Sequence, residues 1–216
     1  MSIDSFRPIC HRFVMTHAQH PPTGQDPRQK AILGAAFDAF RNYGFRRTSM
    51  EDIARGAGMS RAALYLHYRN KEDIFRSLAG YYYDSAEAAV RAELHPARPV
   101  DEALRAAFEA QAGELFEALL SSPHGEELLD TKYAQAADLA EAGEARLAAI
   151  YAAWLTDEAA AGRIDLTPFG GEARALAETM LTALHGLKAP KPDHASYRAS
   201  ADRLAAVFGR ALRVAG

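Results

Sequence analysis

The chain has 216 residues and a formal net charge of −3, with 49% hydrophobic and 25% charged residues, an ordinary composition for a globular protein. Its one cysteine, Cys10, excludes an internal disulfide framework, and no apolar run approaches the roughly 20 residues that a membrane-spanning helix needs. The N-terminus also lacks the apolar segment of a signal peptide, so we expect a cytoplasmic protein.

The charge is distributed unevenly along the chain. Residues 26–76 contain ten Lys and Arg against six Asp and Glu, a net charge of +4, whereas residues 77–216 carry a net charge of −8. A basic segment in an otherwise acidic protein favours local binding of a polyanion such as DNA. An excess of this size also arises by chance, so the charge alone does not decide the function.

Residues 1–25 show no helical periodicity and are predicted to form a flexible tail. His11, His17 and His20 lie in this segment without a cluster of cysteines or carboxylates around them. We therefore predict no metal site and no cofactor. The sequence leaves open whether the native chain starts at Met1 or at Met15.

The first predicted helix covers residues 27–43. Asp26 is a suitable N-cap and Pro27 a suitable first helical residue, and apolar residues then recur at helical spacing, as at Leu33 and Phe40. Gly44 is predicted to end the helix in a left-handed conformation.

Three further helix starts follow closely. Thr48-x-x-Glu51 predicts a capping box before a short helix from Met50 to about Gly56. Ser60 is a predicted cap for a second short helix to about Tyr68, and Asn70-x-x-Asp73 predicts the start of a helix that reaches about Leu94.

The remaining pattern is also helical. We expect a helix after Pro99, a short helix from Pro123 to about Asp130, and longer ones over about 132–161, 172–188 and 194–213. The predicted fold is all-α, with a three-helix helix-turn-helix domain over residues 26–76 and a helical ligand-binding and dimerisation domain over residues 77–216.

The two short helices have a spacing typical of a helix-turn-helix. Ala54 is followed four residues later by Gly58, where the turn needs a positive φ, and six residues after that by Leu64. Such a unit exposes the start of its second helix, residues 60–63, to the major groove, where Arg61 can donate two hydrogen bonds to a guanine. Helices this short are stable only when packed together.

The run TSMEDIARGAGMSRAALYLHYRNKEDIF, with FDAFRNYGFRRT before it, resembles the DNA-binding domain of TetR-family transcriptional regulators. The specific match covers about residues 27–76, and it implies a homodimeric repressor that a small ligand releases from operator DNA. Tyr68 departs from the family pattern, which usually has Phe there, and this favours a core position. The predicted DNA-binding residues are Arg47, Thr48, Ser49, Ser60, Arg61, Ala62, Ala63, Leu64, Tyr65, His67 and Lys71. By resemblance, Thr48, Tyr65, His67 and Lys71 are expected at DNA phosphates.

The second domain is predicted to supply the ligand pocket and the dimer contacts. The candidate pocket residues are Phe108, Phe116, Tyr133, Tyr151, Trp154, Met180 and His185. The candidate dimer residues, on two apolar stripes, are Leu176, Leu184, Leu187, Leu204, Val207, Phe208 and Leu212, although packing within one chain explains such stripes equally well. The negative domain favours a neutral or cationic, largely apolar ligand.

No catalytic motif stands out, so the chain is not expected to be an enzyme. The leading hypothesis is a ligand-responsive DNA-binding regulator that binds operator DNA, a small effector and a second copy of itself, with no membrane partner. The alternatives are a helical protein-interaction module whose helix-turn-helix only packs, and, less favoured, an all-α enzyme. Retention on duplex DNA that depends on salt separates the first from the second.

Overall fold

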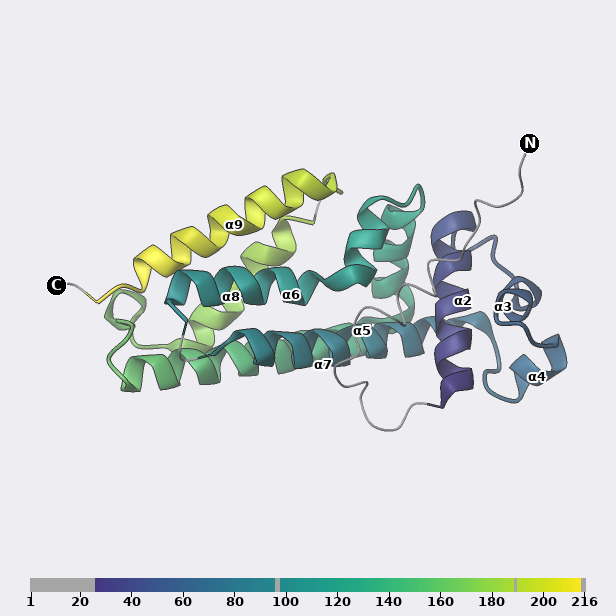
Figure 1. Ribbon diagram of the computed structural model, residues 1–216, viewed down its shortest axis with the longest axis horizontal. Coiled ribbons are helices and arrows are strands. Elements are labelled where there is room, and N and C mark those ends of the chain that lie inside the picture. The colour runs from purple at the N-terminus through teal and green to yellow at the C-terminus, as the bar shows by residue number, and fades with distance from the viewer. Residues whose placement is uncertain (1–25, 96–97, 189, 215–216) are drawn as a thin grey trace. The chain divides into compact units, whose positions relative to one another are not determined.

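The structure is a computed structural model that describes residues 26–95, 98–188 and 190–214, apart from the side chains of residues 131–133. Within these residues the chain is helical and contains no strand, as the sequence predicts (Figure 1). The helices are α2 (Pro27–Tyr43), α3 (Met50–Gly56), α4 (Arg61–Tyr65), α5 (Lys71–Glu93), α6 (Val100–Leu120), α7 (Gly125–Ala160), α8 (Ala173–Gly186) and α9 (His194–Ala211), with a short 3-10 helix at Thr167–Phe169.

The described residues divide into two compact units, the first ending at Leu78 and the second beginning at Ala79. Helix α5 contributes residues 71–78 to the first unit and continues into the second. The boundary proposed from the sequence, after residue 76, lies two residues from this division. The predicted tail and its histidines lie outside the described residues.

The core of the first unit is small and aromatic. The ring centroids of Phe40 and Phe75 each lie 5.2 Å from the ring centroid of Phe45. Helix α3 crosses α2 where Gly56 faces Ala35, and a Cβ atom added at Gly56 would lie 3.1 Å from the Ala35 Cβ. A small residue at this crossing therefore lets the two helices pack closely.

The helix starts of the first unit follow local signals, with one correction. Asp26, Ser60 and Asn70 each accept a backbone N–H at the start of α2, α4 and α5, as predicted. The capping box before α3 is formed by Ser49 and Asp52, and the predicted Thr48–Glu51 pair is wrong by one residue. The register shifts because the Thr48 side chain is buried and bonded elsewhere.

The turns agree with the predicted use of glycine. Gly58, between α3 and α4, has a φ of 67°. Gly44, after α2, has a φ of 84° but an extended ψ of 155°, so its conformation differs from the left-handed helical one that we predicted. Helix α4 ends at Tyr65, three residues earlier than expected.

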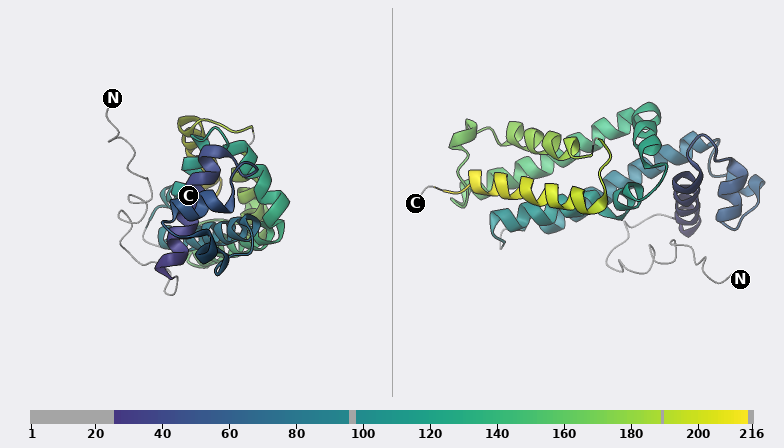
Figure 2. Two further views of the ribbon diagram at one scale, coloured as in Figure 1. Left: turned by 90° about the vertical axis from the view of Figure 1, so that its right-hand side faces the viewer. Right: turned by 90° about the horizontal axis from the view of Figure 1, so that it is seen from above.

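In the second unit, α9 runs alongside α6, and α8 packs against both α7 and α9 (Figures 1 and 2). The core between these helices contains Phe108 and Tyr151, both fully buried, with ring centroids 6.0 Å apart. At the α6–α9 crossing, a Cβ atom on Gly209 would lie 2.6 Å from the Cβ of Asp101, so only glycine fits there.

Two long helices of the second unit differ from the prediction. The structure replaces the short helix from Pro123 and the following long helix with one helix, α7, interrupted at Ala136 by a φ of −141°. Helix α6 is also interrupted, at Gly113, where φ is 63° and ψ is 172°. Neither interruption was predicted, although the glycine is a signal for the second.

Candidate nucleic-acid interface and cavity

Helix α4 presents one face to the core of the first unit and the opposite face to solvent. Leu64 is fully buried, whereas Arg61, Ala62 and Tyr65 are exposed. The inclusion of Leu64 among the DNA-binding residues was therefore wrong: its side chain holds the helix onto the core. Leu66, which we did not predict as a site residue, is 86% exposed. A helix turns about 100° per residue, so a buried Leu64 signals that residue 66 faces away.

Arg61 and Tyr65 form a pair on the exposed face of α4. The Arg61 guanidinium donates to the Tyr65 hydroxyl at 3.2 Å, and its central carbon lies 5.5 Å from the centre of the tyrosine ring. The hydrogen bond raises the pKa of Arg61. Arg61 and Tyr65 lie one helical turn apart, so the tyrosine ring limits the conformations of the long arginine side chain. The remaining N–H groups of the guanidinium are available to a base edge.

The side chain of Lys71 is engaged within the first unit. Its ammonium donates to the backbone carbonyl oxygens of Phe45 at 2.7 Å, Arg46 at 3.1 Å and Thr48 at 3.0 Å. It also lies 4.7 Å from the centre of the Phe45 ring. An ammonium has three donors, and all three are used within the unit. Lys71 therefore holds the turn before α3, and its contact with a DNA phosphate stays a prediction.

The side chain of Thr48 is also engaged within the unit. Its side chain is 2% exposed, and its hydroxyl donates to the carbonyl oxygen of Gly44 at 2.8 Å. The neighbouring Arg47 and Ser49 are exposed on the same turn. The Ser49 hydroxyl and backbone N–H both donate to Asp52, and these bonds hold the pKa of Asp52 below its usual value. The turn is therefore rigid and offers Arg47 to solvent.

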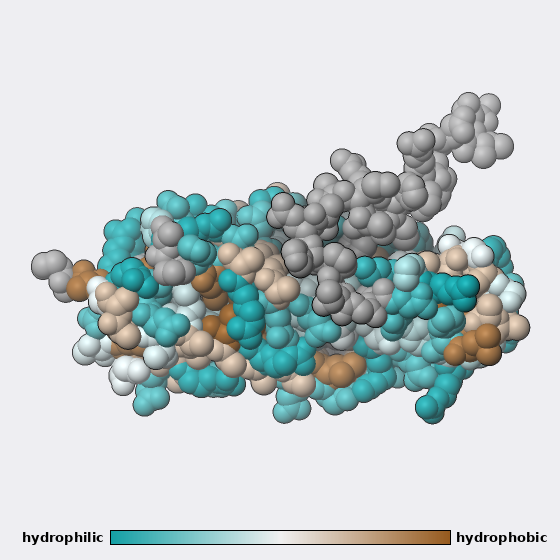
Figure 3. All heavy atoms as spheres, turned by 60° about the horizontal axis from the view of Figure 1, so that its bottom comes forward, coloured by the Kyte–Doolittle hydropathy of each residue, from teal (hydrophilic) through white to brown (hydrophobic). Residues whose placement is uncertain are grey.

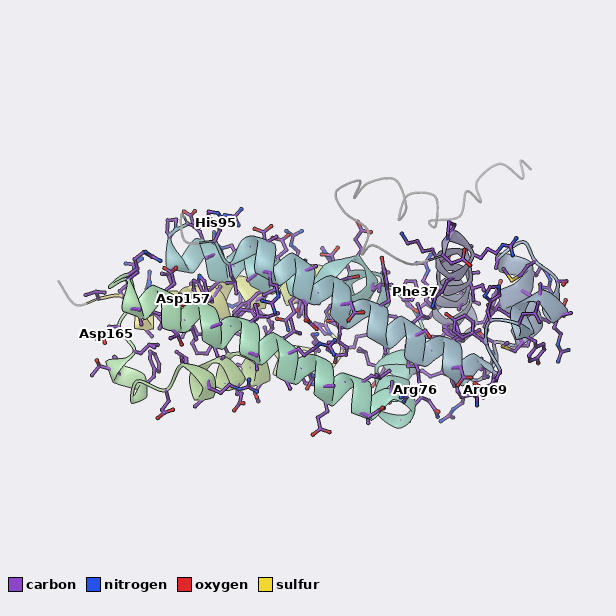
Figure 4. All side chains as sticks on the ribbon, turned by 90° about the horizontal axis from the view of Figure 1, so that it is seen from below. Phe37, Arg69, Arg76, His95, Asp157 and Asp165 are labelled. Carbon is purple, nitrogen blue, oxygen red and sulfur yellow. The ribbon has the colours of Figure 1, made fainter. Side chains whose placement is uncertain are left out.

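The remaining predicted residues lie around these. Ser60 caps α4, Ala63 is partly buried, and exposed His67 lines a shallow groove of about 500 Å³ that also includes Arg28 and Met59. Tyr68 is buried and its hydroxyl accepts from Gln29 at 3.2 Å, which confirms its predicted core position. Arg69 precedes α5 and Arg76 lies within it (Figure 4).

The second unit contains a cavity of about 640 Å³ between α5, α6, α7 and α8. Of the predicted pocket residues, His185 lines it. Phe108, Tyr151, Trp154 and Met180 are instead buried in the core, Phe116 packs beside the cavity, and the side chain of Tyr133 lies outside the described residues. Sequence periodicity marks aromatic residues as buried, but it does not tell a core position from a cavity wall.

The cavity wall carries residues that the sequence did not single out. Tyr82 donates its hydroxyl to the backbone carbonyl of Gln111 at 3.1 Å, two residues before the interruption of α6. The side-chain oxygen of Gln111 accepts from Tyr151 at 3.1 Å. Tyr83 donates to Glu144 at 3.2 Å, and its ring fills the space beside Gly143.

Three of the predicted dimer residues belong to the core of one chain. Leu176, Leu184 and Leu212 are 5%, 1% and 0% exposed, so their side chains face the interior of the second unit and are corrected from dimer contacts to core residues. Leu187, Leu204 and Phe208 are partly buried against the same core, and Val207 is 62% exposed.

Comparison with known proteins places the first unit in a family. Residues 32–78 match the family model described as bacterial regulatory proteins, tetR family. The chain is 35% identical over 95 residues to the HTH-type transcriptional regulator BetI of Rhizobium meliloti, covering 42% of this chain and 47% of BetI. It is 30% identical over 97 residues to the HTH-type transcriptional repressor LfrR of Mycolicibacterium smegmatis, covering 45% of this chain and 50% of LfrR.

The match therefore spans about half the length of these curated relatives. The fold extends further. The structure of SmeT, the repressor of a Stenotrophomonas maltophilia multidrug efflux pump, superposes with a TM-score of 0.65 at 17% identity, covering 87% of this chain and 91% of SmeT. No helix in the described part of the chain is long and apolar enough to cross a membrane. The family-model match, the relatives and the helix-turn-helix together identify the first unit as a DNA-binding domain of the tetR family, and the shared fold with SmeT extends over most of the chain.

Proposed function

We propose that the chain is a homodimeric repressor that reads operator DNA with α4 and is released from it by a small ligand bound in the second unit. The observation that supports DNA reading most directly is the exposed Arg61 at the first position of α4, backed by the buried Leu64. Ala62 is small and exposed next to it, so the helix start can approach base edges closely.

The proposed dimer follows from the need to read two half-sites. A single short helix contacts few base pairs, and two recognition helices about one DNA turn apart supply the rest of the affinity. Val207 is the large apolar residue of α9 that is most exposed, with Leu204 and Phe208 partly exposed near it. The hydrophobic residues on the face drawn in Figure 3 form small separate patches.

The proposed ligand response uses α5. Its first residue, Lys71, holds the turn before α3, and residues 82 and 83 of the same helix form part of the cavity wall. A ligand that changes the position of Tyr82 or Tyr83 acts on the helix that carries Lys71. Such a ligand must prefer the state that does not bind DNA, and a coupling of about 1–3 kcal/mol changes operator affinity about 5–150-fold.

Selection of binding sites from a pool of random duplexes tests the proposal. We expect enrichment of a sequence with two copies of one half-site, with centres about 10–10.5 base pairs or a multiple of this apart. Enrichment of a single unrepeated site would contradict the dimer.

The selected site placed upstream of a reporter gene then tests repression. LfrR is named a repressor and another relative, FasR of Mycolicibacterium smegmatis, an activator, so the sign of the effect is informative. We expect reporter transcription to fall when the protein is expressed. A rise would overturn the repressor assignment while leaving DNA binding intact.

A further inference from the structure

Lys188 follows α8 and lines the cavity of the second unit. Its ammonium lies 4.4 Å from the centre of the Phe116 ring and 6.0 Å from the centre of the Tyr82 ring. Among the described residues, no hydrogen bond or ion pair is made by this ammonium. Burial lowers its pKa from 10.5 to about 8, which shows that the surrounding groups compensate the charge incompletely.

The nearest acidic group does not neutralise Lys188 fully. Glu144 raises the pKa of Lys188, but less than burial lowers it. Its carboxylate accepts from the Tyr83 hydroxyl at 3.2 Å and lies 3.9 Å from Nδ1 of His185. Glu144 is therefore engaged by groups other than Lys188, and the ammonium still lacks a direct anionic partner.

Two other donors of the second unit also lack partners among the described residues. The side-chain oxygen of Gln111 accepts from Tyr151, which leaves its Nε2 group on the other side of the amide, and Nε2 makes no hydrogen bond in the part of the chain that the structure describes. Gln111 is 9% exposed and lines the cavity. The buried Tyr197 hydroxyl likewise has no partner among described residues, and its ring packs 4.9 Å from that of Phe116.

The rest of the wall is suited to an apolar group. Alanines of α7, including Ala140 and Ala148, line the cavity together with Leu147 and Leu181. Figure 4 shows side chains of α5 and α7 meeting between these two helices. One part of a ligand in this cavity would therefore contact apolar side chains, and another part would face the unused donors of Lys188 and Gln111.

The other charged residues of the wall do not favour a cation. Arg174 and Glu178 form an ion pair at 2.6 Å on the exposed face of α8, and Glu141 is exposed to solvent. A carboxylate that is already paired or solvated gains little from a ligand cation, whereas an incompletely compensated ammonium gains a charge-assisted hydrogen bond from a ligand anion.

We propose that the cavity binds an effector with one carboxylate group and a compact apolar body, and that Lys188 and Gln111 hold the carboxylate. A single carboxylate fits better than a phosphate monoester, which carries a charge of about −1.5 to −2, because Lys188 is one cation. This inference rests on the proposed regulatory function and names the chemistry of its ligand. It replaces the neutral or cationic ligand favoured by the charge of the whole domain.

Paired probes test the proposal on the full chain. A panel of aryl and branched alkyl monocarboxylates, each with its primary amide, is screened by thermal shift and then measured by calorimetry. We expect several carboxylates to bind and their amides, which have similar shape but no charge, to bind about tenfold or more weakly. Amides that bind as tightly as the acids, or the absence of binding by every acid, would overturn the proposal.

Two variants locate the binding group. Lys188→Met should lower carboxylate affinity about tenfold or more and leave amide binding unchanged, because it keeps a flexible apolar chain without the charge. Arg198→Gln removes one positive charge from the exposed surface of α9 and should keep wild-type affinity. Equal loss in both variants would show a nonspecific charge effect and contradict the assignment to Lys188.

Operator binding is measured separately with each acid. An acid that binds through Lys188 and leaves operator affinity unchanged supports the carboxylate site and contradicts ligand release. An acid that releases DNA equally well from the Lys188→Met variant supports ligand release and contradicts this site. The two proposals therefore fail in different experiments.

Discussion

The ammonium of Lys71 donates to the backbone carbonyl oxygen of Thr48 at 3.0 Å, although 23 residues separate them. Together with its bonds to Phe45 and Arg46, this contact joins the first turn of α5 to the turn that precedes α3. The turn carries Arg47, an exposed cation beside the helix-turn-helix. Lys71 thus positions this turn, and the first prediction separates this role from a direct contact with DNA.

Replacing Lys71 with Met should lower the free energy of unfolding by about 2 kcal/mol, because three carbonyl oxygens lose a charged donor. Arg47→Ala should leave stability nearly unchanged but should flatten the salt dependence of DNA binding by roughly one unit of slope per subunit contact. Urea unfolding and salt titrations of both variants measure these effects. The reverse pattern, with a stable Lys71→Met protein and a reduced salt slope, would identify Lys71 as a phosphate contact.

The second prediction concerns the proposed dimer. Val207 is 62% exposed on α9, so Val207→Glu should be tolerated by the folded chain but should place two like charges in an apolar subunit contact. Sedimentation should show a monomer while circular dichroism remains helical. Val214→Glu is the control, since Val214 is 52% exposed but lies beyond the end of α9. A dimeric Val207→Glu protein would move the subunit contact elsewhere.

The third prediction concerns the packing of α7 against Tyr83. A Cβ atom on Gly143 would lie 2.2 Å from Cγ of Tyr83, so Gly143→Ala should force the ring to move and destabilise the protein by about 1–3 kcal/mol. Gly80→Ala is a matched control in α5, where a Cβ atom meets nothing within 4 Å and helix propensity favours alanine. Thermal unfolding should separate the two. A Gly143→Ala protein as stable as wild type would mean that Tyr83 has an alternative position at low cost.

The sequence predicted local features well and tertiary roles less well. Gly58 and the cap at Ser60 depend on neighbouring residues, so their conformations follow from short motifs. The role of Lys71 depends on carbonyl groups 23–26 residues away, which no local pattern reveals. The stripe containing Leu184 shows helical spacing, but the same spacing suits a core within one chain and a contact between two chains.

The cavity illustrates the same limit. Its cation, Lys188, follows the end of α8 at a position that sequence reasoning treated as a helix terminus. The sequence around Lys188 does not indicate that the rings of Phe116 and Tyr82 lie beside its ammonium, because these two residues belong to other helices, α6 and α5. A lysine is usually assigned to the surface, so its partial burial had to come from the structure.

The fourth prediction follows from the pKa of Lys188, which is lowered to about 8 in the folded protein from 10.5. Between these values the unfolded chain binds more protons, so this group makes the protein more stable as pH rises through about 8 to 10.5. Lys188→Met should therefore increase the free energy of unfolding at pH 7. The expected net gain is roughly 1–3 kcal/mol, because the variant avoids burying a charge but loses the contacts of the ammonium with the two rings. The advantage should shrink as pH rises toward 10.5.

Urea unfolding of the wild type and Lys188→Met between neutral and alkaline pH measures this difference. Loss of stability at neutral pH in the variant would show that the ammonium is satisfied in the folded protein, which would also weaken the case for an anionic ligand.

The measurement that tests the central claim most directly is the effect of Arg61→Ala on binding energy at each base pair of the selected operator. Arg61 lies exposed at the first position of α4 and is held by Tyr65. We predict that the wild type discriminates about 5–150-fold at one position of each half-site and that the variant loses this preference at that position while keeping the others. An unchanged preference at every position, or equal weakening on all sequences, would contradict base reading by this helix.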